Sequence, residues 1–279
     1  MKRIGFVDHK LENFHANVFL QAFRRQLRNR GWTVAGCFSL HAENGQDWAK
    51  KNDVPWFDSV AALSEHVDAY MILAPSNPEL HLKLAEEVFS FARPTYVDKT
   101  FAPDVATAKR IFDLADRHKT PIQTTSALRY TNVQDHVKEA GGPGKVKHMI
   151  TWGGGSSFEE YAIHPVELLV SCMGATAHTM MRRGTGEHSQ LLVNFADGRT
   201  GVANVYTQGD TPFAASVTTA RQTKMIGVDT SKIFVNNAAA VLDLFESGKP
   251  NIDRAETLVI RRMLDVAADP AAQRGFVAV

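Results

Sequence analysis

Cysteine is scarce in this chain, with two residues among 279. Cys37 and Cys172 lie far apart in the sequence, and each has apolar neighbours. Their spacing excludes a disulfide framework and a cysteine-rich metal cluster, and it predicts two reduced thiols in the core of a cytoplasmic protein. We therefore expect no metal site.

Long apolar runs and an excess of one charge are absent as well. No apolar run approaches the length that spans a bilayer, and the segment Met1–Val7 leads into a strand without an apolar signal region. The 31 basic and 30 acidic residues give a formal net charge of +1. These features predict a soluble protein and give no reason to expect nucleic acid or an anionic membrane as a partner.

Short apolar strands alternate with helices through about residue 126, which is typical of a parallel, doubly wound sheet in an α/β protein. The segment 103–118 shows the helical period, because Val105, Ala108, Ile111 and Ala115 recur on one face. The predicted strands are Arg3–Val7, Thr33–Phe38, Ala69–Leu73, Thr95–Val97 and Ile122–Thr125, and the predicted helices are Asn13–Asn29, Gly45–Asn52, Val60–Glu65, Pro78–Phe91 and Pro103–His118.

The pattern changes after residue 126, where strands with alternating apolar positions follow one another. Asp197-Gly198 lies between two of them and signals a hairpin. We expect a Rossmann-like domain over residues 1–125 and an α+β domain with a mainly antiparallel sheet over residues 126–279. The predicted strands are Val146–Trp152, Leu191–Phe195, Thr200–Tyr206 and Ala215–Thr219, and helices are expected over Asn132–Glu139, around Val166–Val170, and over Ala238–Glu246 and Ala255–Ala267.

Lys99 follows the apolar run Thr95–Val97 directly. A residue at this place emerges at the carboxyl edge of a parallel sheet, where α/β proteins build their sites. Most lysines are solvent-exposed and have no catalytic role, so the position, rather than the residue type, marks Lys99 as a candidate.

The order of several motifs resembles the family of glucose-fructose oxidoreductase, inositol dehydrogenase and MocA-like proteins (Gfo/Idh/MocA) over nearly the whole chain. Asp98-Lys99-Thr100 matches the family's Glu-Lys-Pro motif, and Ala74–Asn77 with His81 matches a Thr-Pro-Asn-like turn. Glu160 and His164 match an Asp-x-x-x-His motif, and Gly248-Lys249-Pro250 with Glu256 is similar to the family's closing helix.

The resemblance implies a dinucleotide-binding first domain, and a second domain for substrate binding and oligomerisation. It implies NAD or NADP as cofactor, held in part by Pro75, Asn77, His81 and Asp98. It also implies a homodimer or homotetramer formed through the second-domain sheet.

The loop Asp8–Asn13 departs from the family, which carries Gly-x-Gly-x-x-Gly after the first strand. Glycines permit the tight turn and let backbone amides approach a pyrophosphate. Here Asp8 and Glu12 are expected to repel a diphosphate, whereas His9 and Lys10 offer compensating positive charge. After the second strand Ser39 replaces the carboxylate that holds the ribose in NAD-binding members, with His41 close behind; a serine there mildly favours NADP, or simply begins a loop.

In the second domain, His164 opens an apolar helix, where a histidine is either a capping or core group or an acid–base group facing a cleft. We expect Glu160 to orient His164 or to bind a sugar hydroxyl. Trp152 begins a predicted Gly153–Gly155 turn that brings backbone close to a ligand. Further substrate-binding candidates are Glu159, Tyr161, Arg129 and Tyr130.

The reaction that the resemblance implies is hydride transfer between a nicotinamide ring and a carbinol of a sugar, cyclitol or related polyol. Lys99 would polarise the oxygen or relay its proton, and His164 would act as general acid or base. Three alternatives stay open: a lyase or glycosidase that oxidises its sugar transiently with bound NAD, a cofactor-free sugar-binding or regulatory protein, and a subunit that mainly assembles with a catalytic partner.

Overall fold

The computed structural model describes residues 1–184 and 186–279, and the chain forms two compact units. The first unit contains Met1–Thr125 and Phe234–Asp253, and the second contains Ser126–Ile233 and Arg254–Val279. The predicted second domain, residues 126–279, includes residues 234–253, whereas the structure assigns this segment to the first unit.

The first unit contains a five-stranded parallel sheet in the order β2-β1-β3-β4-β5. The chain crosses from β2, on one side of β1, to β3, on the other, so the carboxyl ends of β1 and β3 form the switch point at which α/β sheets bind ligands. The predicted parallel sheet is confirmed. The strands are β1 (Lys2–Asp8), β2 (Trp32–Ser39), β3 (Ala69–Ile72), β4 (Thr95–Val97) and β5 (Ile122–Thr124).

Helices connect these strands, and three of them begin at a capping side chain. Asn13, Ser59 and Asp104 each accept a backbone N–H of the first helical turn, which satisfies one of the donors that a helix start leaves open. The helices are α1 (Phe14–Arg24), α2 (Ala42–Asn52), α3 (Val60–Ser64), α4 (His81–Phe89) and α5 (Val105–Arg117), with 3-10 turns at Arg28–Arg30 and Pro78–Leu80.

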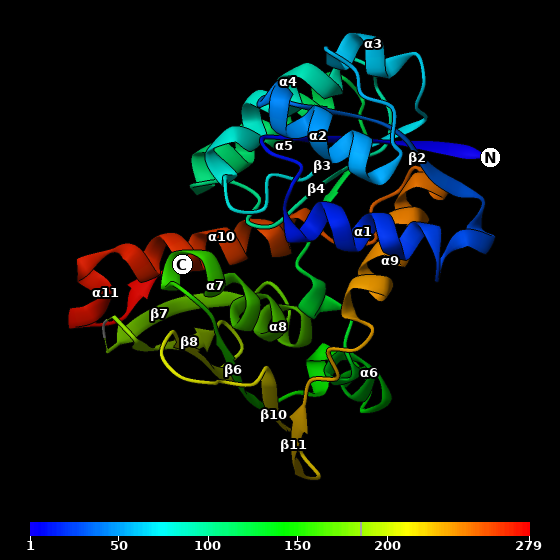
Figure 1. Cartoon of the computed structure of the whole chain (residues 1–279). Coiled ribbons are helices and arrows are strands. Elements are labelled where there is room, and N and C mark those ends of the chain that lie inside the picture. The colour runs from blue at the N-terminus through cyan, green and yellow to red at the C-terminus, as the bar shows by residue number, and fades with distance from the viewer. Residues whose placement is uncertain (185) are drawn as a thin grey trace. The chain divides into compact units, whose positions relative to one another are not determined.

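The helix α9 (Ile233–Ser247) belongs to the first unit and lies beside α1 (Figure 1). Its residues Ala238, Val241 and Leu242 share one hydrophobic core with Phe19 and Phe23 of α1. At its far end, Glu246 accepts hydrogen bonds from the side chains of Arg30 and Trp32. Burial of this apolar face explains why α9 returns to the first unit.

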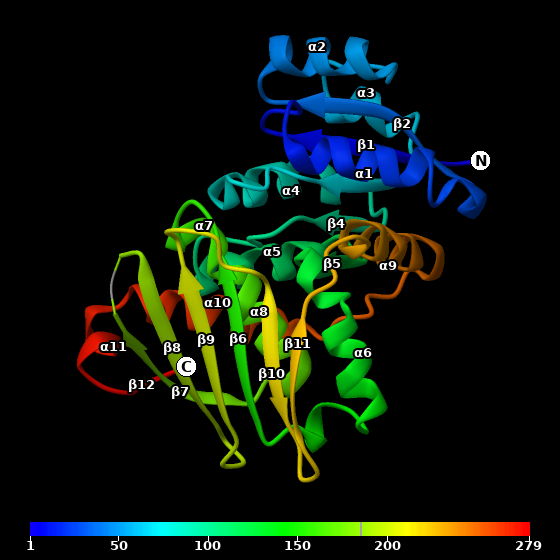
Figure 2. The ribbon, with the colours of Figure 1, turned by 60° about the horizontal axis from the view of Figure 1, so that its bottom comes forward.

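The second unit contains a seven-stranded sheet in the order β11-β10-β6-β9-β8-β7-β12, whose strands lie side by side in Figure 2. β6 and β9 are parallel, and the other neighbouring pairs are antiparallel, which confirms the predicted mainly antiparallel sheet. The strands are β6 (His148–Gly154), β7 (Ala177–Arg183), β8 (His188–Phe195), β9 (Thr200–Tyr206), β10 (Ala214–Thr218), β11 (Thr223–Gly227) and β12 (Val277–Ala278).

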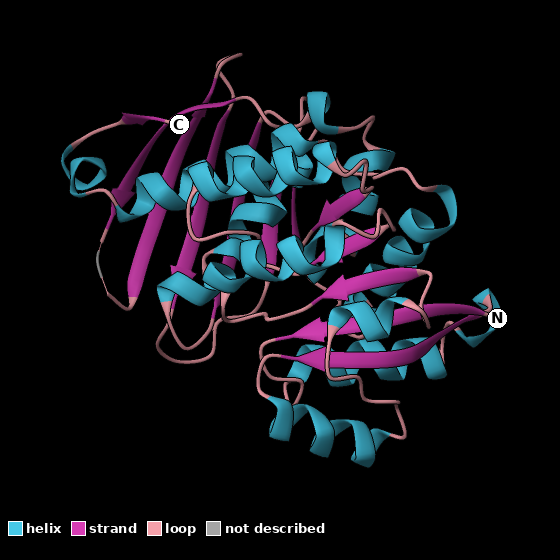
Figure 3. Cartoon of the chain, turned by 90° about the horizontal axis from the view of Figure 1, so that it is seen from above, coloured by secondary structure: helices cyan, strands magenta, loops and turns pink. Residues whose placement is uncertain are grey.

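Helices lie across one face of this sheet, as Figure 3 shows, and α8 packs on β6 and β9. Burial alternates along β6 and β8, as expected for strands with one buried face. The strands β7, β11 and β12 are not among those predicted from the sequence. The helices are α6 (Asn132–Glu139), α7 (Phe158–Tyr161), α8 (Ile163–Met173), α10 (Arg254–Ala268) and α11 (Pro270–Arg274), with 3-10 turns at Ala127–Arg129 and Pro143–Lys145.

Candidate functional site

The carboxyl edge of the first sheet gathers the predicted nucleotide-binding residues of the first unit. Asp8 ends β1, Ser39 ends β2, Pro75 follows β3, and Asp98 and Lys99 follow β4. Because all five strands are parallel, these ends lie along one edge, at the place where ligands bind in such folds.

Asp8 is buried, and its carboxylate is enclosed by hydrogen-bond donors of the following loop. It accepts the backbone N–H of Lys10 at 3.1 Å and the side-chain amide of Asn13 at 3.0 Å. Burial raises the pKa of Asp8 to about 7, although these hydrogen bonds and others from the backbone of His9 and Ala74 oppose the rise. The carboxyl group therefore takes up a proton close to neutral pH.

The loop amides that a glycine-rich loop offers to a pyrophosphate are largely paired within the protein. Asp8 takes the N–H of Lys10, the side chain of Asn44 accepts the N–H of Glu12 at 3.2 Å, and Asn13 caps the N–H of Ala16 at 2.9 Å. The loop therefore does not fit a diphosphate in the way that a glycine loop does. The side chain of Glu12 pairs instead with Lys51 at 3.0 Å and is exposed.

Imidazole and ammonium side chains surround the same strand ends. The rings of His9 and His41 meet edge to face with centroids 4.7 Å apart, and the buried Nδ1 of His9 has no hydrogen-bond partner among the described residues. Burial, and then the charges of His41 and Lys10, lower the pKa of His9. An arriving phosphate would offset that repulsion, so His9, His41 and Lys10 fit a phosphate through their side chains. Ser39 donates its hydroxyl to the carbonyl of His41 at 2.8 Å.

Lys99 is 9% exposed, and its Nζ donates to the carbonyl oxygen of Pro75 at 3.0 Å. Asp98 is buried, and both of its carboxylate oxygens contact protein groups: His15 on one side, and Tyr96 and the backbone of Lys99 on the other. Asp98 was predicted to bind the cofactor, whereas the structure gives these oxygens partners within the protein. His15 was not predicted as a site residue.

His81 and Asn77 contact the protein as well. The ring nitrogens of the buried His81 lie 2.8 Å from the carbonyl oxygen of Leu73 and 3.0 Å from that of Phe101. Asn77 donates its side-chain amide to Glu79 at 2.9 Å. His81 therefore connects the chain after β3 to the chain after β4 through its ring nitrogens, and its contact with a nucleotide stays a prediction.

In the second unit, His164 lies in the first turn of α8 with polar and aromatic neighbours. Its Nδ1 lies 3.3 Å from the hydroxyl of Ser126, and its ring lies 5.7 Å from that of Tyr161 and 5.6 Å from that of Phe213, measured between centroids. Glu160, which was expected to orient His164, accepts the hydroxyl of Ser156 at 3.3 Å. Glu159 is exposed.

The glycines after Trp152 do not form the predicted turn, because Gly153 and Gly154 continue strand β6. A Cβ atom on Gly154 would lie 2.2 Å from the carbonyl oxygen of Tyr206, and one on Gly155 would lie 2.1 Å from the ring of Tyr161. The close approach that these glycines permit is therefore to the protein itself. Trp152 is half-buried within the strand.

Arg129 is held between two carboxylates of the second unit. Its guanidinium donates to Glu167 at 2.9 Å and to Glu256 at 2.6 Å, while its buried Nη2 has no hydrogen-bond partner among the described residues. Burial opposes the charge, but the two carboxylates raise the pKa of Arg129 overall. Tyr130 beside it is half-buried.

Glu167 is a further residue of this cluster that is not among the predicted site residues. It also accepts the backbone N–H of Ser126 at 2.6 Å, so it joins Arg129 to the segment that contacts His164. The signal was present: a single carboxylate within the apolar run Pro165–Val170, one helical turn after His164.

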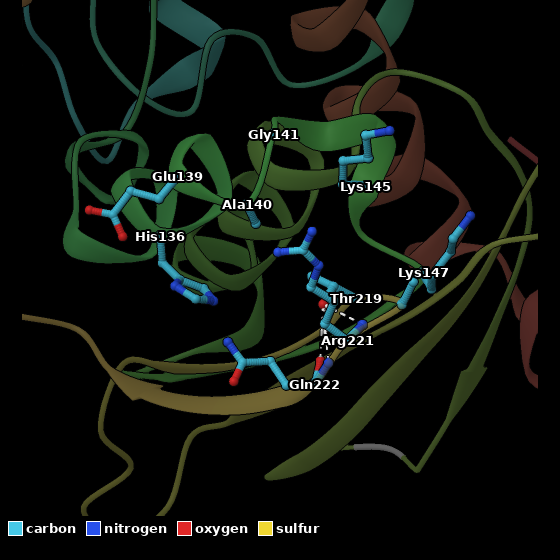
Figure 4. A pocket seen from close by; sticks show the side chains of 10 residues that line it. His136, Glu139, Ala140, Gly141, Lys145, Lys147, Thr219, Arg221 and Gln222 are labelled. Carbon is cyan, nitrogen blue, oxygen red and sulfur yellow. Dashed lines mark hydrogen bonds between the residues drawn. The ribbon is translucent and has the colours of Figure 1, made fainter.

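A hollow of about 720 Å³ lies elsewhere on the second unit, between the end of α6 and the β10–β11 hairpin (Figure 4). Its lining includes three cations, Lys145, Lys147 and Arg221, and one carboxylate, Glu139. None of the predicted site residues lines it, and the cations are exposed side chains.

Comparison with known proteins finds a family model that matches the first part of the chain. Residues 4–126 match the model of an oxidoreductase family with an NAD-binding Rossmann fold, Gfo/Idh/MocA. No curated protein matches the sequence. Among the described residues, no helix has the length and apolar character needed to cross a membrane.

Solved structures resemble the whole chain at low sequence identity. Myo-inositol 2-dehydrogenase from Lactobacillus plantarum is 12% identical with a TM-score of 0.82, covering 100% of this chain and 99% of its own. UDP-N-acetylglucosamine 3-dehydrogenase GnnA from Acidithiobacillus ferrooxidans is 14% identical with a TM-score of 0.80, covering 98% of each chain. GenD2 from gentamicin A biosynthesis, solved in complex with NAD, is 14% identical with a TM-score of 0.80, covering 100% of this chain and 97% of its own. The predicted resemblance is confirmed: over residues 4–126 the chain matches the model of the NAD-binding Gfo/Idh/MocA oxidoreductase family, and its loop Asp8–Asn13 lacks glycine.

Proposed function

We propose that this protein is an NAD(P)-dependent oxidoreductase acting on a carbinol of a sugar, cyclitol or related polyol. The observation that carries the proposal is the place of Lys99, a largely buried lysine at the carboxyl end of β4 in a Rossmann unit of this family. Structural neighbours named as inositol and UDP-sugar dehydrogenases support the substrate class.

In this proposal the site residues bind the cofactor, stabilise the substrate oxygen and accept a proton. The bound dinucleotide supplies the hydride acceptor. His9, Lys10 and His41 hold its phosphates with side chains, in place of the loop amides that Asp8 and Asn13 occupy. Lys99 donates a hydrogen bond to the substrate oxygen and favours its negative charge.

His164 accepts the hydroxyl proton, for which an imidazole is suited near neutral pH. Ser126 and the ring of Tyr161 hold the orientation of His164. Arg129 and Tyr130 are the proposed contacts for further hydroxyl or acidic groups of the substrate.

A second candidate, a cofactor-free sugar-binding protein, is favoured by the pairing of the loop amides with Asp8, Asn13 and Asn44. We also propose a cytoplasmic homodimer or homotetramer, assembled through the half-exposed face of the second-unit sheet. Sedimentation analysis of the purified protein tests the assembly.

Mass spectrometry of the freshly purified, denatured protein tests the main proposal by detecting a released nicotinamide dinucleotide. Calorimetric titrations with NAD and NADP, and turnover assays with inositols and UDP-sugars, complete the test. Nucleotide binding together with reduction of the nicotinamide supports the oxidoreductase. Nucleotide binding with product but no net reduction favours the lyase or glycosidase, and sugar binding without nucleotide binding favours the second candidate.

A further inference from the structure

His15, in the first turn of α1, contacts Asp98 at the end of β4. The distance from His15 Nδ1 to Asp98 Oδ2 is 2.5 Å, and the two side chains are 14% and 1% exposed. This is a short, shielded hydrogen bond between groups 83 residues apart in the sequence. It connects the helix that follows the nucleotide loop to the residue before Lys99.

The other oxygen of Asp98 holds the backbone of Lys99. Asp98 Oδ1 accepts the N–H of Lys99 at 2.8 Å and the hydroxyl of Tyr96 at 3.1 Å. Burial by itself raises the pKa of Asp98, but the charge and hydrogen bond of His15, with a smaller effect of Lys99, lower it overall. His15 thus keeps Asp98 ionised, and an ionised carboxylate is the stronger acceptor for the Lys99 amide.

Aromatic rings fix the orientation of His15. Phe14, Phe19 and Phe234 lie around it, with ring centroids 6.0, 6.2 and 5.5 Å away. The helix start itself is fixed by Asn13, whose side chain both caps α1 and donates to Asp8. A continuous set of contacts therefore runs from the loop Asp8–Asn13 through His15 and Asp98 to Lys99.

We propose that His15 is a positioning residue for Lys99: through Asp98, it ties the first turn of α1 to the Lys99 backbone and so fixes where the Lys99 amine is presented. The inference rests on the proposed function in one respect, the contact of Lys99 with the substrate. It assigns a role to a residue that neither the motif resemblance nor the loop pattern marked.

Acylation of lysines by acetic anhydride, followed by peptide mass spectrometry, tests the proposal without any cofactor. His15→Leu removes the hydrogen-bond donor, whereas His15→Asn keeps a donor near the place of Nδ1. We expect Lys99 to react at least about fivefold faster in His15→Leu, because the 98–100 segment opens more often, and within about twofold of the wild-type rate in His15→Asn. The exposed Lys109 serves as the internal reference.

Asp98→Asn changes the other partner of the His15–Asp98 hydrogen bond, so the proposal can still be tested if His15→Leu fails to fold. This variant too should expose Lys99 to acylation. Equal Lys99 reactivity in the wild type and in whichever of these variants folds overturns the proposal. Where turnover is found, His15→Leu should lower kcat about tenfold or more with little change in KM or in the nucleotide Kd, and His15→Asn should restore part of kcat. Absence of turnover in the wild type rejects the proposed function but leaves the acylation result standing.

Discussion

Asn13 donates its side-chain amide to the Asp8 carboxylate at 3.0 Å, across the loop in which related proteins place glycines. The same Asn13 caps α1 by accepting the N–H of Ala16. The Asn13 side chain therefore hydrogen-bonds both the buried Asp8 carboxylate and the first turn of α1. Neither group is then available to a phosphate that enters the loop.

The contacts of Asp8 and Asn13 should lower the affinity for a nucleotide. We expect binding of NAD or NADP at least about tenfold weaker than in a glycine-loop relative, about 1.4 kcal/mol. The double change of Asp8 and Glu12 to glycine should tighten binding, as measured by calorimetric titration. Asp8→Gly should account for most of the gain, since Glu12 is exposed and pairs with Lys51, so Glu12→Gly is the matched control. Unchanged or weaker binding in the double variant would show that these residues are not the obstacle.

Stability should depend on pH through Asp8. Its pKa is raised to about 7 from 3.8 in the unfolded chain, so between these values the folded state binds more protons. The contribution of Asp8 to the free energy of unfolding is therefore present at low pH and is lost as pH rises from about 4 to about 7, by about 1.4 kcal/mol per unit of pKa difference.

Asp8→Asn should remove this loss of stability. Relative to the wild type, its free energy of unfolding should therefore increase more at pH 8 than at pH 5. Denaturant titrations at both values measure the difference, and Asp47→Asn, at an exposed aspartate, should show no comparable change. If Asp8→Asn weakens the protein equally at both values, the carboxylate is ionised and stabilising, and this account of Asp8 is wrong.

Lys99→Met and His164→Ala should each lower turnover by about 100-fold or more while the protein stays folded. The double variant should lose much less than the product of the two effects, because groups that serve one step share one loss of transition-state stabilisation. Turnover and Tm are measured for each variant, with the exposed Lys109→Met as control. A lowered Tm for His164→Ala with normal turnover for Lys99→Met would assign both residues to structure.

Gly155→Ala should displace the ring of Tyr161, because the new Cβ would lie 2.1 Å from it. Overpacking of this kind costs about 1–3 kcal/mol in the free energy of unfolding. Since Tyr161 packs beside His164, kcat should fall as well. Gly144→Ala, where no atom lies within 4 Å of the added Cβ, is the control; equal behaviour of the two variants in denaturant titration would argue against a steric role for Gly155.

The sequence by itself determined the layered α/β first unit and the strands that carry the site. Val97, Asp98 and Lys99 follow the pattern of a buried strand ending at a sheet edge, and the structure has that strand with the predicted bounds Thr95–Val97. The helix Asn132–Glu139 was also predicted with its observed bounds, because helical periodicity and capping depend on residues that are close in the sequence. The hairpin at Asp197-Gly198 follows from the same local chemistry.

Only the tertiary structure decided which distant residues meet. The pairing of His15 with Asp98, of Arg129 with Glu167 and Glu256, and the return of α9 to the first unit all join segments separated by tens of residues or more. Such contacts depend on strand order and on which apolar faces are buried together, and no local period encodes either. The residue types at the site were therefore visible in the sequence, while the partners that set their charge and orientation came from the packing of the fold.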